Sequence, residues 1–369
     1  MYFSEVEVDL AKIRTNFQRL QRAFPGRIMA PVLKSDAYGH GAGHVAAALA
    51  KEGCRHFCVF SVDEARQLRQ SGVAARLWLL GGMMDGEGEE AAALADNAAF
   101  ALWDSRQLAG MVEAAERYGV CFDVHIAVDT GMNRLGFYPG QLPVVLSRLA
   151  GVPGIRVAGA FSHLASADNP DSVQTDMQVR RFHEACSFLP DAARELHLCA
   201  TPGMMAGVAP QLHYMRPGFA IYGYGHDSRR PDLSFEPAMS FRSRIISLKR
   251  VPAGESISYS ALYTVPGGGS KIAVVPVGYA NGYPRCLENR AHVLVRGRRA
   301  PVRGRICMGM LMADVSGIPG VECGDEVTLL GRQGGETVSG EELAALAGTV
   351  PYEILCALGK EPHRRFVNG

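Results

Sequence analysis

The sequence predicts a closed (β/α)8 barrel of the TIM type over residues 1–234, followed by a mainly β domain over residues 235–369. Along the first part of the chain, short apolar segments alternate with amphipathic ones. After residue 235, strands separated by glycine- and proline-bearing turns replace this alternation. A chain of 369 residues also exceeds what one hydrophobic core usually carries, so two domains are expected. Residues 1–9, which precede the first helix, are candidates for pairing with the second domain.

The barrel is expected to open with an amphipathic helix at about residues 10–24. Eight short apolar segments follow, and the stretches between them have helical spacing, polar starts, and glycine or asparagine stops. Eight such units over about 225 residues match a closed parallel barrel better than an open doubly wound sheet. The predicted strands are 28–33, 56–60, 76–80, 99–103, 122–128, 157–161, 195–199 and 213–216.

The second domain contains apolar runs joined by hairpin-type turns, such as "AHVLVRGRRAPVRGRICMGM" and "GDEVTLLGRQGG". Two short helices are expected near its end. The segment "SGEELAALAG" begins with Ser339, a residue type that caps helix amino termini, and "PYEILCAL" begins with Pro351. The boundary between the domains is expected between Asp232 and Pro237.

The composition excludes several classes of protein. With 38 basic and 37 acidic side chains the chain has no basic field for nucleic acid, and no run of 18 apolar residues predicts a membrane span. The amino terminus lacks the pattern of a secretion signal. Nine cysteines are scattered without a C-x-x-C pair or zinc-ligand spacing, so no metal site is expected and a reducing cytoplasm fits best.

Polar side chains follow the predicted barrel strands at the point where each strand ends. Lys34 ends the first strand and Tyr38 follows after a turn, while Arg134, His163 and Arg216 follow the fifth, sixth and eighth strands. In barrels of this type the chemistry lies at the carboxyl ends of the strands. A single residue of this kind is more often solvated or salt-bridged, but several on one rim indicate an active site.

These residues suit one kind of cofactor. A lysine beside apolar residues loses its proton more readily, and the free amine condenses with an aldehyde. In many barrels, glycines near a helix start bring backbone N–H groups close to a phosphate, and "RPGFAIYGYG" has glycines of this kind. A phosphorylated aldehyde satisfies both features.

The segments around these positions resemble the pyridoxal-phosphate-dependent alanine racemases. "VLKSDAYGHG" is similar to the cofactor-lysine motif of that family, and "VDTGMNRLGF", "RPGFAIYG", "ISYSALYT", "PVGYANGYPR", "GRICM" and "PYEILC" match further motifs in the family's order. The matches cover nearly the whole chain. The resemblance implies a head-to-tail homodimer in which each active site receives residues from the partner's second domain.

The resemblance also implies residue roles. Lys34 would bind pyridoxal 5′-phosphate covalently and serve as one catalytic base, and Tyr259 of the partner subunit would serve as the other. Arg216 would face the pyridine nitrogen, and His163 would bridge Arg216 and Tyr259. The chemistry of racemisation requires two such groups, because a proton must leave one face of the α-carbon and another must arrive at the opposite face.

The remaining roles concern the substrate and the phosphate. Arg134 would bind the substrate carboxylate, and Tyr279 and Met308 of the partner subunit would border the substrate. The residues that fall where the family binds the cofactor phosphate are Tyr38, Thr201, Gly218, Phe219 and Tyr352.

The charged neighbours of the second base have a physical meaning. The pKa of tyrosine is ordinarily near 10, so a catalytic tyrosine needs cationic neighbours, which His163 and Arg216 are expected to supply. The Arg216 guanidinium stays protonated and cannot hand its proton to the pyridine ring. The ring would then stabilise a carbanion less, which suppresses transamination.

The sequence departs from the family pattern at several positions. Ala127 replaces a lysine that supports the carboxylate-binding arginine in many members, so Arg134 needs another support, such as a bound anion. Gly309 replaces a pocket-lining aspartate, and Ala200 replaces an asparagine beside Thr201. None of these changes touches the proposed bases, so the chemistry is expected to be intact.

Racemisation of L- and D-alanine is therefore the predicted function. The alternatives are a racemase of serine or of a broader amino-acid range, a non-catalytic pyridoxal-phosphate carrier, and a decarboxylase that uses Cys307. A carrier has no use for a second base, and a decarboxylase would be expected to use a partner cysteine and acidic residues where this sequence has Tyr259.

Overall fold

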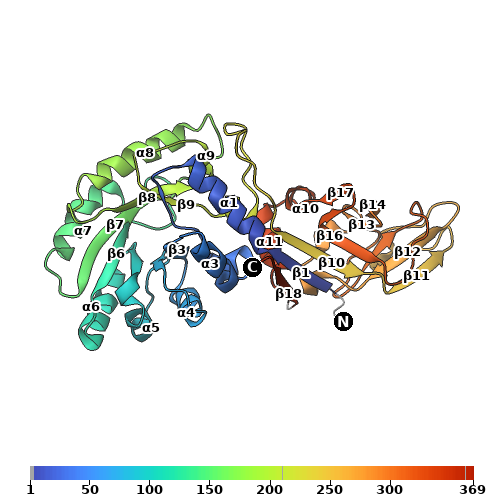
Figure 1. Cartoon of the computed structure of the whole chain (residues 1–369), viewed down its shortest axis with the longest axis horizontal. Coiled ribbons are helices and arrows are strands. Elements are labelled where there is room, and N and C mark those ends of the chain that lie inside the picture. The colour runs from blue at the N-terminus through green and yellow to red at the C-terminus, as the bar shows by residue number, and fades with distance from the viewer. Residues whose placement is uncertain (1–3, 210, 362) are drawn as a thin grey trace. The chain divides into compact units, whose positions relative to one another are not determined.

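The computed structural model describes residues 4–209, 211–361 and 363–369. The chain clusters into two compact units, each of which is assembled from separate parts of the sequence (Figure 1). The barrel unit comprises Lys12–Ala37 and Ala42–Glu236, and the β-rich unit comprises the described residues up to Ala11, Tyr38–Gly41, and Pro237–Gly369.

The barrel unit contains eight parallel strands in the order β2-β9-β8-β7-β6-β5-β4-β3. A parallel bridge between Val32 and Cys58 joins the segment after β2 to β3 and so links the two ends of this order. The predicted barrel is therefore confirmed. Its strands are β2 (Ile28–Met29), β3 (His56–Val59), β4 (Arg76–Leu79), β5 (Ala98–Leu102), β6 (Phe122–Ala127), β7 (Ile155–Phe161), β8 (Glu195–Ala200) and β9 (Tyr214–Arg216).

Helices lie outside these strands, as Figure 1 shows for α3 to α8. Because helices cover the outer face and side chains fill the interior, strands such as β5 and β6 are buried along their whole length. The α-helices of this part of the chain are α1 (Leu10–Ala23), α3 (Ala42–Lys51), α4 (Val62–Gln70), α5 (Gly88–Ala92), α6 (Arg106–Tyr118), α7 (Leu142–Leu149), α8 (Val173–Cys186) and α9 (Thr201–Met205).

The β-rich unit contains one larger sheet, in the order β14-β13-β16-β10-β1-β18 with β17 on β16, and one smaller sheet, β11-β12-β15. The amino-terminal β1 is antiparallel to β10 and parallel to β18, which places the blue start beside the red end in Figure 1. The strands are β1 (Ser4–Asp9), β10 (Met239–Arg244), β11 (Ser247–Val251), β12 (Ser270–Val275), β13 (His292–Val295), β14 (Arg298–Pro301), β15 (Leu311–Asp314), β16 (Glu326–Gln333), β17 (Glu336–Val338) and β18 (Arg364–Val367).

Two helices complete this unit: α10 (Gly340–Ala347) and α11 (Pro351–Leu358). The Ser339 side chain accepts a hydrogen bond from the N–H of Glu342 at 3.1 Å, so the predicted cap is confirmed. Over the whole described chain, no helix combines the length and the apolar character that crossing a membrane requires.

Candidate active site

Lys34 begins a left-handed turn at the carboxyl end of the first barrel strand. Residues 35–38 all have positive φ angles, between 53° and 56°. None of them is glycine, and this conformation costs roughly 1–2 kcal/mol for each non-glycine residue. The surrounding structure must therefore hold the turn in place.

Two carboxylates hold the turn. The Glu64 side chain, on α4, accepts hydrogen bonds from the backbone N–H groups of Ser35 and Phe60, both at 2.7 Å. Asp36 accepts one from the N–H of Ala42 at 2.7 Å. These contacts tie the lysine-bearing turn to the start of α3 and to α4.

Arg216 ends β9 with its guanidinium buried. One terminal nitrogen donates to the His197 carbonyl at 2.9 Å and to His197 Nδ1. The other donates to the carbonyls of Ser162 and Leu198 at 2.8 and 3.1 Å. Four of the five donors of a guanidinium are thereby occupied. The fifth, Nε–H, has no hydrogen-bond partner among the described residues.

His163 lies within reach of three cationic side chains. Burial, and then the charges of Arg216, Arg134 and Lys34, lower the pKa of His163 to about 3. A neutral imidazole is therefore expected near pH 7, which differs from the positive charge that the sequence predicts for His163. The three cations themselves give this end of the barrel a positive potential, which favours phosphate and carboxylate ligands.

Arg134 lies in the loop that follows β6. Asp129 accepts hydrogen bonds from the N–H groups of Gly131 and Asn133 at 2.9 and 3.0 Å. The Arg134 side chain is exposed and has no hydrogen bond or ion pair to any residue that the structure describes. Nothing in the described chain takes over the support that the lysine at the position of Ala127 gives in many members of the family that the sequence resembles.

Thr201 begins the short helix after β8. Its hydroxyl oxygen accepts hydrogen bonds from the backbone N–H groups of Gly218 and Ala220 at 3.2 and 3.3 Å. Phe219 lies between these two residues and begins the 3₁₀ turn Phe219–Tyr222. Three of the five predicted phosphate residues thus lie together in the barrel unit.

The other two predicted phosphate residues, Tyr38 and Tyr352, lie together in the β-rich unit, with ring centroids 5.5 Å apart. Backbone packing explains the glycines here. A Cβ on Gly359 would lie 2.2 Å from the Gly39 Cα, and a Cβ on Gly39 would lie 2.6 Å from the Leu355 carbonyl oxygen. Glycine at both positions allows the turn after Tyr38 to pack directly against α11.

The predicted partner-derived residues lie on exposed loops of the β-rich unit. Tyr259, Tyr279 and Met308 are 68%, 44% and 63% exposed. The N–H of Ala280 donates to the Met308 carbonyl at 2.9 Å, which joins two of the loops. Ser258, which precedes Tyr259, donates through its hydroxyl to the Arg305 carbonyl at 2.8 Å, which joins the third.

Most of the chain matches two successive family descriptions. Residues 8–226 match "Alanine racemase, N-terminal domain", and residues 238–366 match "Alanine racemase, C-terminal domain". The chain belongs to the alanine racemase family. It is therefore an enzyme of the isomerase class.

Known alanine racemases resemble the chain along its full length. The alanine racemase of Syntrophobacter fumaroxidans is 40% identical over 376 residues, which cover 100% of this chain and 99% of that protein. Among solved structures, the biosynthetic alanine racemase of Pseudomonas aeruginosa has a TM-score of 0.86 at 33% identity, with complete coverage of both chains. The alanine racemase of Clostridium difficile 630 has a TM-score of 0.91 at 30% identity, covering 100% of this chain and 96% of its own.

A more distant likeness shows the fold alone. The alanine racemase of Bartonella henselae is 24% identical, with a TM-score of 0.88 and complete coverage of both chains, and its structure contains covalently bound pyridoxal phosphate.

Sequence reasoning missed four residues that support the alanine racemase site. The buried His197 and His125 and the half-buried Glu195 form a hydrogen-bonded series behind Arg216. Their signal in the sequence was the histidine inside each of the strands "FDVHIA" and "ELHLCA". The sequence around Glu64 has no comparable feature, because "VDEARQ" is typical of an ordinary charged helix start.

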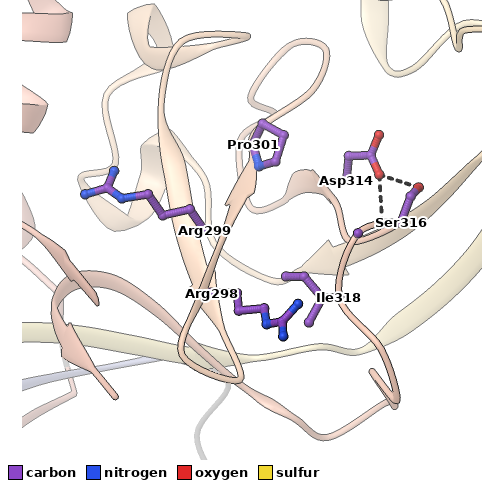
Figure 2. Close-up of a pocket in the computed structure, with 7 residues that line it drawn as sticks. Arg298, Arg299, Pro301, Asp314, Ser316 and Ile318 are labelled. Atoms are coloured by element: carbon purple, nitrogen blue, oxygen red, sulfur yellow. Dashed lines mark hydrogen bonds between the residues drawn. The ribbon is translucent and has the colours of Figure 1, made fainter. Parts of the chain in front are cut away.

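A shallow pocket of about 290 Å³ lies in the β-rich unit, lined by residues of β14, β15 and the loop after it (Figure 2). Figure 2 shows Arg299 pointing away from Asp314, and its guanidinium pairs with Glu336 and Glu342. Asp314 is occupied by hydrogen bonds from the N–H and hydroxyl of Ser316. None of the lining residues is a predicted site residue.

Proposed function

We propose that the chain racemises L- and D-alanine with pyridoxal 5′-phosphate bound covalently at Lys34. The observation that carries this proposal is Arg216, a buried arginine whose only remaining donor, among the described residues, is Nε–H. A pyridine nitrogen is an acceptor that fits such a donor. When bound, the cofactor supplies an electron sink that makes the α-proton of the substrate acidic.

The residues of the barrel unit fit the charges of the cofactor and substrate. Thr201, Gly218 and Phe219 are the proposed phosphate residues, since the Thr201 hydroxyl accepts two N–H bonds and keeps its own O–H for a phosphate oxygen. Arg134 is the proposed ligand of the substrate carboxylate, because its guanidinium is exposed and uncommitted within the described chain. Tyr38 and Tyr352 are proposed further phosphate residues.

Two bases are needed because a single base returns a proton only to the face from which it was taken. Lys34 is the proposed base on one face once the substrate amine has displaced it, and Tyr259 is the proposed base on the other. Each positioned base contributes roughly 10²- to 10⁴-fold in rate. Since His163 is neutral, Arg216 carries the charge, and His163 contributes a hydrogen-bonding group.

We propose that Tyr259 acts in the active site of a partner subunit of a homodimer. In one chain Tyr259 is 68% exposed, as is expected of a residue that a second subunit covers. Tyr279 and Met308, on neighbouring loops, are proposed to border the substrate in the same way. The proposed compartment is the cytoplasm, because nine free thiols suit a reducing environment.

A second candidate is racemisation of serine or of a broader set of amino acids. It is favoured by Gly309, where a Cβ would meet no atom within 4 Å. Space for a side chain is therefore present at the position where the family's aspartate is missing.

The decisive assay supplies purified holoenzyme with L-alanine, L-serine and larger L-amino acids, and measures both enantiomers and carbon dioxide. Racemic alanine is expected. Replacing Lys34 by Ala should lower the rate at least about 100-fold, while Lys51→Ala, at the exposed end of α3, should not. Carbon dioxide release would identify a decarboxylase instead, and binding without turnover of any substrate would identify a carrier.

A further inference from the structure

A series of hydrogen bonds runs from Arg216 into the barrel interior. His197 Nδ1 faces the Arg216 guanidinium, and its Nε2 lies 2.9 Å from His125 Nδ1. His125 Nε2 in turn lies 2.7 Å from a carboxylate oxygen of Glu195. Arg216 and both histidines are buried, so water does not complete these contacts.

The series ends in a charged network at the opposite end of the barrel. Glu195 is the first residue of β8 and pairs at 3.0 Å with Arg76, the first residue of β4. Arg76 also binds Asp123 at 2.7 Å, and Asp123 binds Arg156 at 2.5 Å. Arg216 is the last residue of β9. The hydrogen bonds therefore connect the carboxyl end of the barrel to its amino end.

Aromatic rings hold His197 from both sides. The Trp78 and Phe161 rings stack on the imidazole with centroids 4.3 and 5.1 Å away and interplanar angles of 15° and 2°. The ring plane is thus fixed by packing, and only the positions of its protons are left to be set.

Hydrogen-bond chemistry sets those positions. A guanidinium has donors only, so His197 Nδ1 must accept and its proton must lie on Nε2. That proton is donated to His125 Nδ1, which leaves the His125 proton on Nε2, pointing at Glu195. A proton on His125 Nδ1 would reverse the series and leave two donors facing each other at Arg216. Burial lowers the pKa of both histidines, which agrees with neutral rings.

We propose that Glu195, through His125 and His197, is a positioning residue for Arg216. The carboxylate fixes both imidazoles in the neutral Nε2–H tautomer, and His197 Nδ1 then holds one guanidinium nitrogen so that Nε–H is the donor left for a ligand. The identity of the group that accepts from this Nε–H rests on the proposed function. The placement of the protons along the series from Glu195 to Arg216 does not depend on it.

The test compares wild-type holoenzyme with Glu195→Gln by solid-state ¹⁵N NMR of ¹⁵N-histidine-labelled protein, with the two rings assigned from His125→Gln and His197→Gln. In Glu195→Gln, Arg76 can only donate and so claims the amide oxygen, which turns the amide N–H₂ toward His125. The matched control is Asp123→Asn, which removes a carboxylate from the same network without touching His125.

In the wild type and in Asp123→Asn, both rings are expected to be neutral with the proton on Nε2. In Glu195→Gln, His125 is expected to carry its proton on Nδ1. A charged ring or an Nδ1–H form of His197 in the wild type would overturn the proposal, and so would unchanged tautomers in Glu195→Gln. If Glu195→Gln does not fold, the wild-type spectrum alone decides.

Activity provides a second measurement. The kcat for alanine should fall about tenfold in Glu195→Gln, the effect of losing one hydrogen bond to a charged group, and should stay within about twofold in Asp123→Asn. If Glu195→Gln lost activity but kept the wild-type tautomers, the positioning role of Glu195 would be contradicted and the racemase function would be unaffected. If the wild type did not racemise alanine, the proposed function would be overturned. The tautomers would still test the positioning role of Glu195.

Discussion

Lys34, Arg134 and Arg216 give the rim of the barrel three positive charges around one neutral imidazole. Their combined effect is visible at His163, whose pKa is lowered to about 3 by burial and then by all three cations. A site of this kind binds dianionic phosphate and a carboxylate favourably, and it also depresses the pKa of an adjacent phenol. The proposed base Tyr259 would therefore act beside arginine and lysine charges and without a cationic histidine.

The residue that most affects substrate choice is expected to be Gly309. Replacing it with Asp should fit without a clash, because a Cβ there meets no atom within 4 Å. The added side chain should raise the ratio of kcat/KM for alanine to that for a larger amino acid about tenfold, as measured by steady-state kinetics. The matched control is Gly317→Asp, whose position is equally open. An unchanged ratio in Gly309→Asp would show that this residue does not border the substrate.

At the scale of the elements, the left-handed turn after Lys34 is the most costly conformation in the site. Its four residues have positive φ angles, and Glu64 satisfies the N–H of Ser35 on one side and that of Phe60 on the other. A strained turn held by a carboxylate keeps the lysine amine in one place, which a flexible loop would not do.

Glu64→Ala should therefore lower the free energy of unfolding by about 1–3 kcal/mol, because two backbone donors lose a charged acceptor. The same variant should slow covalent loading of the cofactor at Lys34, followed by absorbance. Asp63→Ala, one position earlier on α4, removes an exposed ion pair with Arg66 and an exposed side-chain hydrogen bond from Gln67, and should change stability by about 0.5 kcal/mol or less. Equal effects of the two variants would show that Glu64 does not hold the turn.

The elements differ in how far the sequence predicts them. The eight strands, the cap at Ser339 and the helix start at Pro351 follow from local periodicity and residue type, and the structure contains them. The left-handed turn was not predicted, because Ser, Asp, Ala and Tyr have no local preference for positive φ and only tertiary contacts impose it. Likewise, no local pattern shows that Glu195 on β8 reaches His125 on β6.

At the scale of the whole molecule, buried histidines make stability depend on pH. Burial is the largest cause that lowers the pKa of His125, His163 and His197. The unfolded chain therefore binds more protons than the folded chain below the ordinary histidine pKa of about 6.5. The free energy of unfolding of the holoenzyme should fall as the pH is lowered from about 7 to 5, a window in which most carboxylates stay ionised. Denaturant titrations that show constant or rising stability on acidification would contradict this.

The sequence also predicts the parts of the molecule that a single chain leaves exposed. Tyr259, Tyr279 and Met308 are assigned to the active site by the resemblance, yet each is largely accessible in one chain. The proposed second subunit would cover these side chains, since large apolar and aromatic side chains on neighbouring loops are typical of an interface.

Hybrid dimers test the central claim most directly. Lys34→Ala and Tyr259→Phe subunits are each expected to be inactive alone, and are then mixed under conditions that allow subunit exchange. Random pairing makes about half of the dimers hybrid, each with one intact site, so activity should recover to about a quarter of the wild-type value. Full activity of Tyr259→Phe alone, or no recovery after exchange has been verified, would contradict a site in which Lys34 of one subunit works with Tyr259 of the other.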